Sequence, residues 1–121
     1  MAMTINLGDE VITVDQASTS ARELIRSRVK QEVERYNQTL PEVFQGLVQP
    51  EESEQILNGF RMKAPRPLDW EVQNERACSS FERNGFLMLV NGVQVLELDE
   101  PLELREDSEI QFVKLVPLVG G

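Results

Sequence analysis

The sequence lacks histidine altogether and has a single cysteine in 121 residues. Histidine is the commonest general base near neutral pH and the commonest zinc ligand, so its absence removes both uses and any Ser–His or Cys–His nucleophile pair. The glycine-rich phosphate loop and the dinucleotide-binding fingerprint are also missing. Carboxylates or lysines could still form an active site, but no motif indicates one. We therefore predict that the protein is not an enzyme and binds no cofactor of its own.

The single cysteine and the charge balance indicate the expected location and partners. Cys78 has no second cysteine with which to form an internal disulfide, which favours the reducing cytoplasm. The N-terminus shows no basic segment followed by an apolar run, so no signal peptide is expected. No apolar run is long enough to span a bilayer. A net charge of -9 argues against nucleic acid and anionic membranes, which attract basic patches, and favours a basic or apolar protein surface as partner.

The first third of the chain shows two hydrophobic patterns. Short β-prone runs at 4–7 and 11–14 flank a glycine-containing turn, which predicts a hairpin. Apolar residues then recur at helical spacing over 18–36, which predicts a helix. Ser18 or Thr19 is the expected N-cap, because a hydroxyl there accepts a hydrogen bond from a free backbone amide.

The region 38–84 is divided by prolines into short pieces. We expect short helices that begin at Pro41 and Pro50, since proline suits the first turn of a helix. A longer helix is expected from an Asp69 cap to about Arg83. Together these pieces predict a helical insertion that packs onto the rest of the domain.

The last third of the chain returns to β-strand patterns. The apolar run 86–90 and the run 93–96 are separated by Asn91-Gly92, the favoured two-residue hairpin turn. The following segment, 99–109, is expected to be an acidic loop.

Leu102 and Leu104 of that loop are expected to turn inward. The β-branched and aromatic run 110–116 predicts a final strand. Pro117 lacks a backbone N–H and should end its ladder.

The order strand, strand, helix, helical insertion and three strands predicts an α+β fold with its helices on one side of a small sheet. At 121 residues, the chain is expected to form one domain. Within it we predict the insertion at about 38–84 and a flexible C-terminal tail at 117–121.

Three features of the last third of the chain, together with this order of elements, resemble the β-grasp (ubiquitin-like) superfamily. They are most similar to its bacterial sulfur-carrier branch, typified by ThiS and MoaD. The features are the Val90-Asn91-Gly92 hairpin, the acidic turn Glu106-Asp107-Ser108-Glu109, and the strand Ile110-Gln111-Phe112-Val113 that leads to Gly120-Gly121.

The resemblance implies a mixed β-grasp sheet and a reaction at the C-terminal carboxylate of Gly121. In the family, an adenylating (ubiquitin-activating-type, ThiF/MoeB-like) enzyme uses ATP and Mg to activate that carboxylate. The product is then thiocarboxylated for sulfur transfer, or conjugated to an amine as a protein modifier. A transfer enzyme, a deconjugating protease or a sulfurtransferase would be further partners. The alternative is a β-grasp interaction module whose glycines are never activated.

The residues of the tail suit entry into a narrow nucleotide site. Gly120 and Gly121 lack a Cβ and adopt unusual backbone angles readily. Leu118 and Val119 can bury apolar surface on the partner, at about 25 cal/mol per Å². Pro117 restricts the free tail and directs it away from the sheet.

The expected docking surface combines one face of the sheet with the acidic turn. Its residues are Leu87, Leu89, Val113, Leu115, Glu106 and Asp107.

Overall fold

The structure is a computed structural model that describes the backbone of residues 3–7, 10–14, 18–57 and 59–114, and the side chains of 18–57 and 59–114. The strands are β1 (Met3–Leu7), β2 (Glu10–Val14), β3 (Ser18–Ser20), β4 (Val43–Phe44), β5 (Ser53–Ile56), β6 (Gly59–Met62), β7 (Phe86–Val90), β8 (Val93–Val95), β9 (Pro101–Glu103) and β10 (Glu109–Lys114). The helices are α1 (Ala21–Thr39) and α2 (Trp70–Glu82). The predicted α+β class is confirmed.

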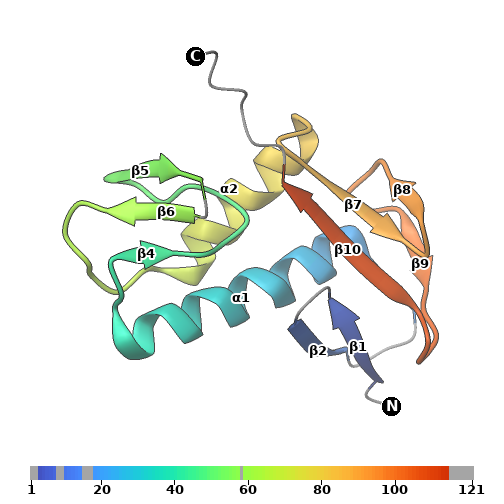
Figure 1. Ribbon diagram of the computed structural model, residues 1–121. Helices are drawn as coiled ribbons and strands as arrows, with labels where there is room; N and C mark the ends of the chain where they lie inside the picture. The colour runs from blue at the N-terminus through green and yellow to red at the C-terminus, as the bar shows by residue number, and fades with distance from the viewer. Residues whose placement is uncertain (1–2, 8–9, 15–17, 58, 115–121) are drawn as a thin grey trace.

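The largest sheet has the strand order β2-β1-β10-β7-β8 (Figure 1). β1 runs parallel to β10, and the other neighbouring strands are antiparallel. The sheet shares one core with α1 and α2, and it contributes buried Phe86, Met88 and Ile110 to that core. The two predicted hairpins are confirmed. The predicted last strand is confirmed as far as Lys114, because residues 115 and 116 lie outside the described part of the chain.

The turn between β7 and β8 holds the start of β10. Asn91 and Gly92 have φ values of 50° and 81°, the left-handed conformation of a primed hairpin turn. The Asn91 side-chain oxygen accepts from the Glu109 backbone N–H at 2.9 Å, and the Asn91 N–H donates to the Glu109 carbonyl at 2.8 Å. The motif singled out in the sequence therefore sets the position of the last strand.

The prediction of two short helices that begin at Pro41 and Pro50 is wrong. The segment instead forms a second antiparallel sheet of order β4-β6-β5. Leu40 ends α1 in the left-handed conformation (φ 47°), which turns the chain away from the helix axis before Pro41. Glu52 is also left-handed (φ 54°), so Pro50 opens a turn. The insertion is thus a small sheet followed by a helix, and α2 with its Asp69 cap lies where it was predicted.

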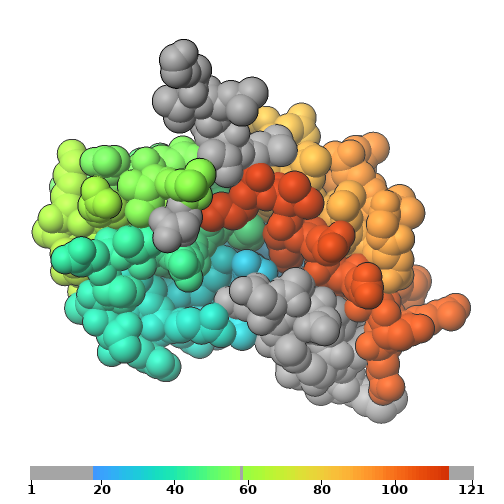
Figure 2. All heavy atoms as spheres, viewed as in Figure 1, coloured from blue at the N-terminus to red at the C-terminus, as the bar shows by residue number. Residues whose placement is uncertain are grey.

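The insertion packs against α1 and against the end of β10, as Figures 1 and 2 show. Asn37 lies within α1, and its side chain donates to the Leu68 carbonyl at 2.9 Å and accepts from the Leu68 backbone N–H at 2.8 Å. Phe44 packs edge-on against Tyr36, with 5.3 Å between ring centroids. These contacts make the insertion part of the same core.

Glu32 is a buried charged residue on α1 that joins the helix to the insertion. Its Oε2 accepts from Arg28 Nε at 2.9 Å, and its Oε1 accepts from the Leu47 backbone N–H at 3.3 Å. The Glu32 side chain is only 2% exposed. The carboxylate therefore hydrogen bonds within α1 through Oε2 and across the boundary to the insertion through Oε1.

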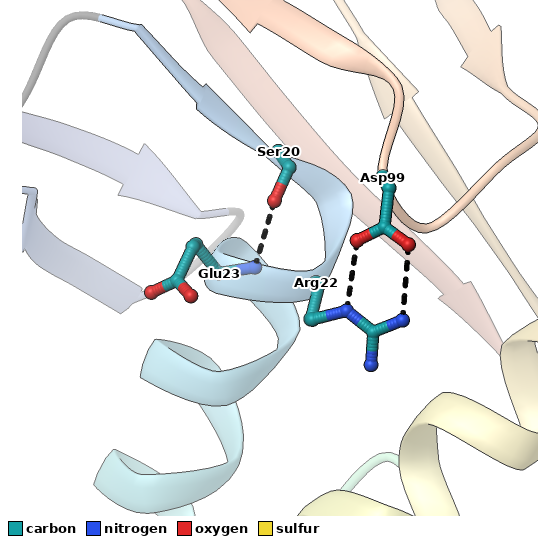
Figure 3. A network of polar contacts seen from close by, with 4 residues as sticks. All are labelled: Ser20, Arg22, Glu23 and Asp99. Carbon is teal, nitrogen blue, oxygen red and sulfur yellow. Dashed lines mark hydrogen bonds and ion pairs between the residues drawn. The ribbon is translucent and has the colours of Figure 1, made fainter.

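Helix α1 begins three residues later than the sequence predicts. Ser18–Ser20 pair with β9, so Ser20 takes the N-cap position expected for Ser18 or Thr19. The Ser20 hydroxyl accepts from the Glu23 backbone N–H at 3.4 Å (Figure 3). The predicted acidic loop therefore contains the short strand β9, while Leu102 and Leu104 are buried as expected.

An ion pair at the start of α1 connects the helix to the loop after β8. Arg22 donates from Nε and Nη2 to the two Asp99 oxygens at 2.9 and 3.1 Å (Figure 3). The Arg22 backbone N–H donates to the Leu98 carbonyl at 2.9 Å. The hydrogen bond from Arg22 lowers the pKa of Asp99 below its ordinary value of 3.8.

We expect Arg22→Ala to raise the pKa of Asp99 towards that ordinary value, as measured by NMR titration of its carboxyl carbon. A lowered carboxyl pKa contributes stability above the unfolded-state pKa, and this contribution is lost as pH falls through the folded-state pKa. The difference in unfolding free energy between wild type and variant should therefore shrink below about pH 4. Arg26→Ala is the matched control, because its contact with Glu23 is 3.9 Å long. An unchanged Asp99 midpoint in Arg22→Ala would contradict the assignment.

Neither helix in the described part of the chain is long and apolar enough to cross a membrane.

Candidate functional site

The predicted activation tail and part of the predicted docking surface belong to the end of the chain after Lys114. Leu115, Pro117, Leu118, Val119, Gly120 and Gly121 lie outside the described residues. The other predicted residues belong to β7, to β10 and to the turn before β10.

One face of the sheet brings three predicted apolar residues together. Val113 lies directly opposite Leu87 in the antiparallel β10–β7 pair, and Leu89 follows two residues along. Successive side chains of a strand point to opposite faces, so these residues lie on the face away from buried Phe86 and Met88. Leu87 and Leu89 are half-buried, whereas Val113 is 38% exposed. We call Leu87, Leu89 and Val113 the outer apolar face.

The acidic turn lies at the other end of β10. Glu106 and Asp107 are exposed in the turn that precedes this strand. The Ser108 hydroxyl is buried there and accepts from the Arg105 backbone N–H at 2.8 Å. A strand rises about 3.3 Å per residue, which places Asp107 roughly 20 Å from Val113. The predicted docking surface is therefore two separate regions in the described structure.

The structure has a cleft that the sequence did not predict, on the other side of β10 from the outer apolar face. It has a volume of about 540 Å³ and lies between α2, the insertion sheet and the end of β10. Residues that line it include Gln49, Gln55, Phe60, Arg76, Arg83 and Lys114. We call it the basic cleft.

Lys114 connects the basic cleft to the start of the tail. It is the last residue of β10, and its Nζ lies 5.2 Å from the centroid of the Phe60 ring in β6. Burial lowers the pKa of the Lys114 ammonium. The last described residue of the chain is therefore in contact with the insertion.

The α2 wall of the basic cleft is a polar stripe. The cleft is lined by Arg76, Ser79 and Ser80 of α2 and by its C-cap residue Arg83, at positions i, i+3, i+4 and i+7, which share one side of a helix. Arg76 donates from Nε and Nη2 to the Gln49 carbonyl at 3.1 and 2.7 Å, so it also connects α2 to the insertion. The helical spacing of these polar residues was a signal available in the sequence. The sequence does not show that the insertion sheet and the end of β10 face them across a cleft.

Burial raises the pKa of the Cys78 thiol, which packs in the core. In the residues that the structure describes, no group of three or more histidines, cysteines or acids is arranged to hold a metal. Comparison of the chain with protein-family models, curated proteins and solved structures gives no match.

Proposed function

We propose that the protein is a ubiquitin-like carrier or modifier whose C-terminal carboxylate at Gly121 is adenylated by a ThiF/MoeB-like enzyme. The observation that carries this proposal is the position of β10. The strand that leads to Gly120-Gly121 is central in the sheet, parallel to β1 and antiparallel to β7. An N-terminal hairpin, a helix across the sheet and a central last strand support a β-grasp assignment.

A central strand gives the tail a defined starting point. β1 pairs with Glu109 and Ile110 at the start of β10, and β7 pairs with the strand from Ile110 to Lys114. This pairing restrains the direction of β10, so a partner that contacts the outer apolar face meets the chain at a fixed place before Leu115. Ordering the tail costs roughly 1–2 kcal/mol per residue in backbone entropy. Burial of Leu118, Val119 and the outer apolar face would offset part of that cost.

The proposed reaction requires a free α-carboxylate at Gly121. A carboxylate oxygen attacks the α-phosphorus of ATP, and the bond to the departing pyrophosphate breaks, which leaves an acyl-adenylate. A persulfide or a lysine amine then displaces AMP. The persulfide gives an acyl disulfide, which a thiol cleaves to the thiocarboxylate with release of a disulfide, whereas the amine gives an isopeptide bond. ATP and Mg are bound by the partner enzyme in this scheme.

The test is incubation of the full chain with ThiF/MoeB-like enzymes, ATP and Mg. ATP–pyrophosphate exchange that depends on the chain is the expected result. Intact mass then distinguishes the products: replacement of oxygen by sulfur indicates a carrier that uses a sulfurtransferase. Attachment to a second protein indicates a modifier, with a transfer enzyme and a deconjugating protease as further partners. No exchange and no mass change with Gly121 free would reject activation and favour the interaction module.

Charge reversal at Glu106 or Asp107 should slow association with the adenylating enzyme several-fold at low salt, with little effect at high salt. Both side chains are exposed, and their distance from Val113 favours a role in steering rather than in the docked contact. Stopped-flow association rates measure the effect. Glu34→Lys makes the same charge change at an exposed position on α1 and is the control. Equal rates for the turn variants and the control would remove the turn from the site.

A further inference from the structure

The charge of the basic cleft is opposite to that of the whole chain. The protein carries a formal net charge of -9. The cleft is lined by the cations of Arg76, Arg83 and Lys114 and by one carboxylate, that of Glu75. A cleft lined by charges of one sign attracts groups of the opposite charge. The local surplus of positive charge therefore favours an anionic ligand.

The remaining lining of the cleft suits a peptide. Ser79 and Ser80 present hydroxyl groups, and Gln55 presents a side-chain amide, all of which can hydrogen bond to peptide groups. Leu47, Val48 and Phe60 supply apolar lining beside them. Nucleic acid is a poorer fit, because its binding depends on many phosphate contacts and the cleft has few cations.

The cleft lies beside the start of the segment whose terminal carboxylate is proposed to be activated. Lys114 belongs both to the cleft lining and to the end of β10, directly before the segment that leads to Gly121. A protein that grips this segment therefore approaches the cleft as well. The outer apolar face lies on the other side of β10, so the two surfaces are distinct.

We propose that the basic cleft binds an acidic peptide segment of the adenylating enzyme, with Arg83 and Lys114 as the main contacts to its carboxylates. This inference rests on the proposed function for the identity of the partner. The insertion then acts as a specificity element, because it supplies most of the residues that line the cleft beside the start of the tail.

A glutamate-rich peptide flanked by leucines tests the cleft directly, with the ¹⁵N-labelled full chain observed by NMR. The expected result is shifts of the Gln55, Ser79 and Ser80 amide signals. Arg83→Ala and Lys114→Gln should each weaken binding up to about 5-fold, the range of a partly exposed ion pair. Arg105→Ala removes an exposed arginine outside the cleft and should bind as wild type. Amide spectra of all variants verify the fold.

Pyrophosphate exchange tests the identity of the partner. Arg83→Ala and Lys114→Gln should raise the KM for the chain by about the same factor, with kcat retained in Arg83→Ala. An unchanged KM in both variants overturns the inference. So does equal binding of a lysine-rich peptide, or inorganic phosphate that shifts the same amides as strongly. Failure of the proposed function is distinct, because wild type itself would then show no exchange.

Discussion

Gly121→Ala is expected to lower kcat/KM for ATP–pyrophosphate exchange by about 100-fold while the fold stays intact. The proposed reaction needs the terminal carboxylate in line with the α-phosphate of ATP. A Cβ next to that carboxylate both limits the backbone angles and widens the chain in a narrow channel. A displacement of about 1 Å from the reactive geometry costs on the order of 100-fold in rate.

Two further variants test whether the effect is specific to the carboxylate of Gly121. Addition of one alanine after Gly121 should abolish exchange unless a protease removes it, because the reactive carboxylate is then displaced. Lys63→Ala changes an exposed residue of the insertion outside the cleft and should retain full exchange. Unchanged amide spectra verify the fold in each case. Wild-type exchange by Gly121→Ala would contradict activation at this residue.

Glu32→Ala is expected to lower the free energy of unfolding by about 3 kcal/mol, because it removes a buried carboxylate that pairs with the partly buried Arg28 and accepts a buried backbone N–H. The substitution leaves the Leu47 N–H without its carboxylate acceptor and takes the acceptor at 2.9 Å from Arg28 Nε. Arg28 also lies over the Phe112 ring of β10, 5.5 Å from its centroid. Glu32 therefore stabilises the meeting point of α1, the insertion and the last strand.

Denaturant unfolding of three proteins measures this effect. Glu34→Ala removes an exposed carboxylate two residues away and should change stability by no more than about 0.5 kcal/mol. Glu32→Gln keeps an oxygen acceptor without the charge and should fall between the two. A loss in Glu32→Ala as small as that in Glu34→Ala would show that the buried pair contributes little.

The elements that the sequence predicted correctly are those with a strong local signal. Helix α1 shows helical apolar spacing over many residues, and α2 begins at the Asp69 cap. The β7–β8 hairpin depends on Asn91-Gly92, whose left-handed conformations are intrinsic to those residue types. Local backbone preference and hydrophobic period were sufficient here, because they need no information about distant residues.

Local backbone preference and hydrophobic period could not predict the insertion strands or the basic cleft. β4, β5 and β6 have two to four residues each, too few to establish an alternating pattern. Their strand conformation comes from pairing with one another and from burial of Phe44, Phe60 and Met62 in the core. Secondary-structure propensity is weak, so these tertiary contacts override the helix signals of the nearby prolines.

By itself, the sequence determined that histidine chemistry is absent, that the chain has α+β character, and that an apolar strand leads towards Gly120-Gly121. Only the tertiary structure decided that β10 lies in the centre of the sheet beside β1, and that Glu106 and Leu87 are far apart. It also brought Arg83 and Lys114 to one cleft. The physical reason is that pairing and burial between distant segments depend on the whole chain, whereas turns and helical periods depend on a few neighbouring residues.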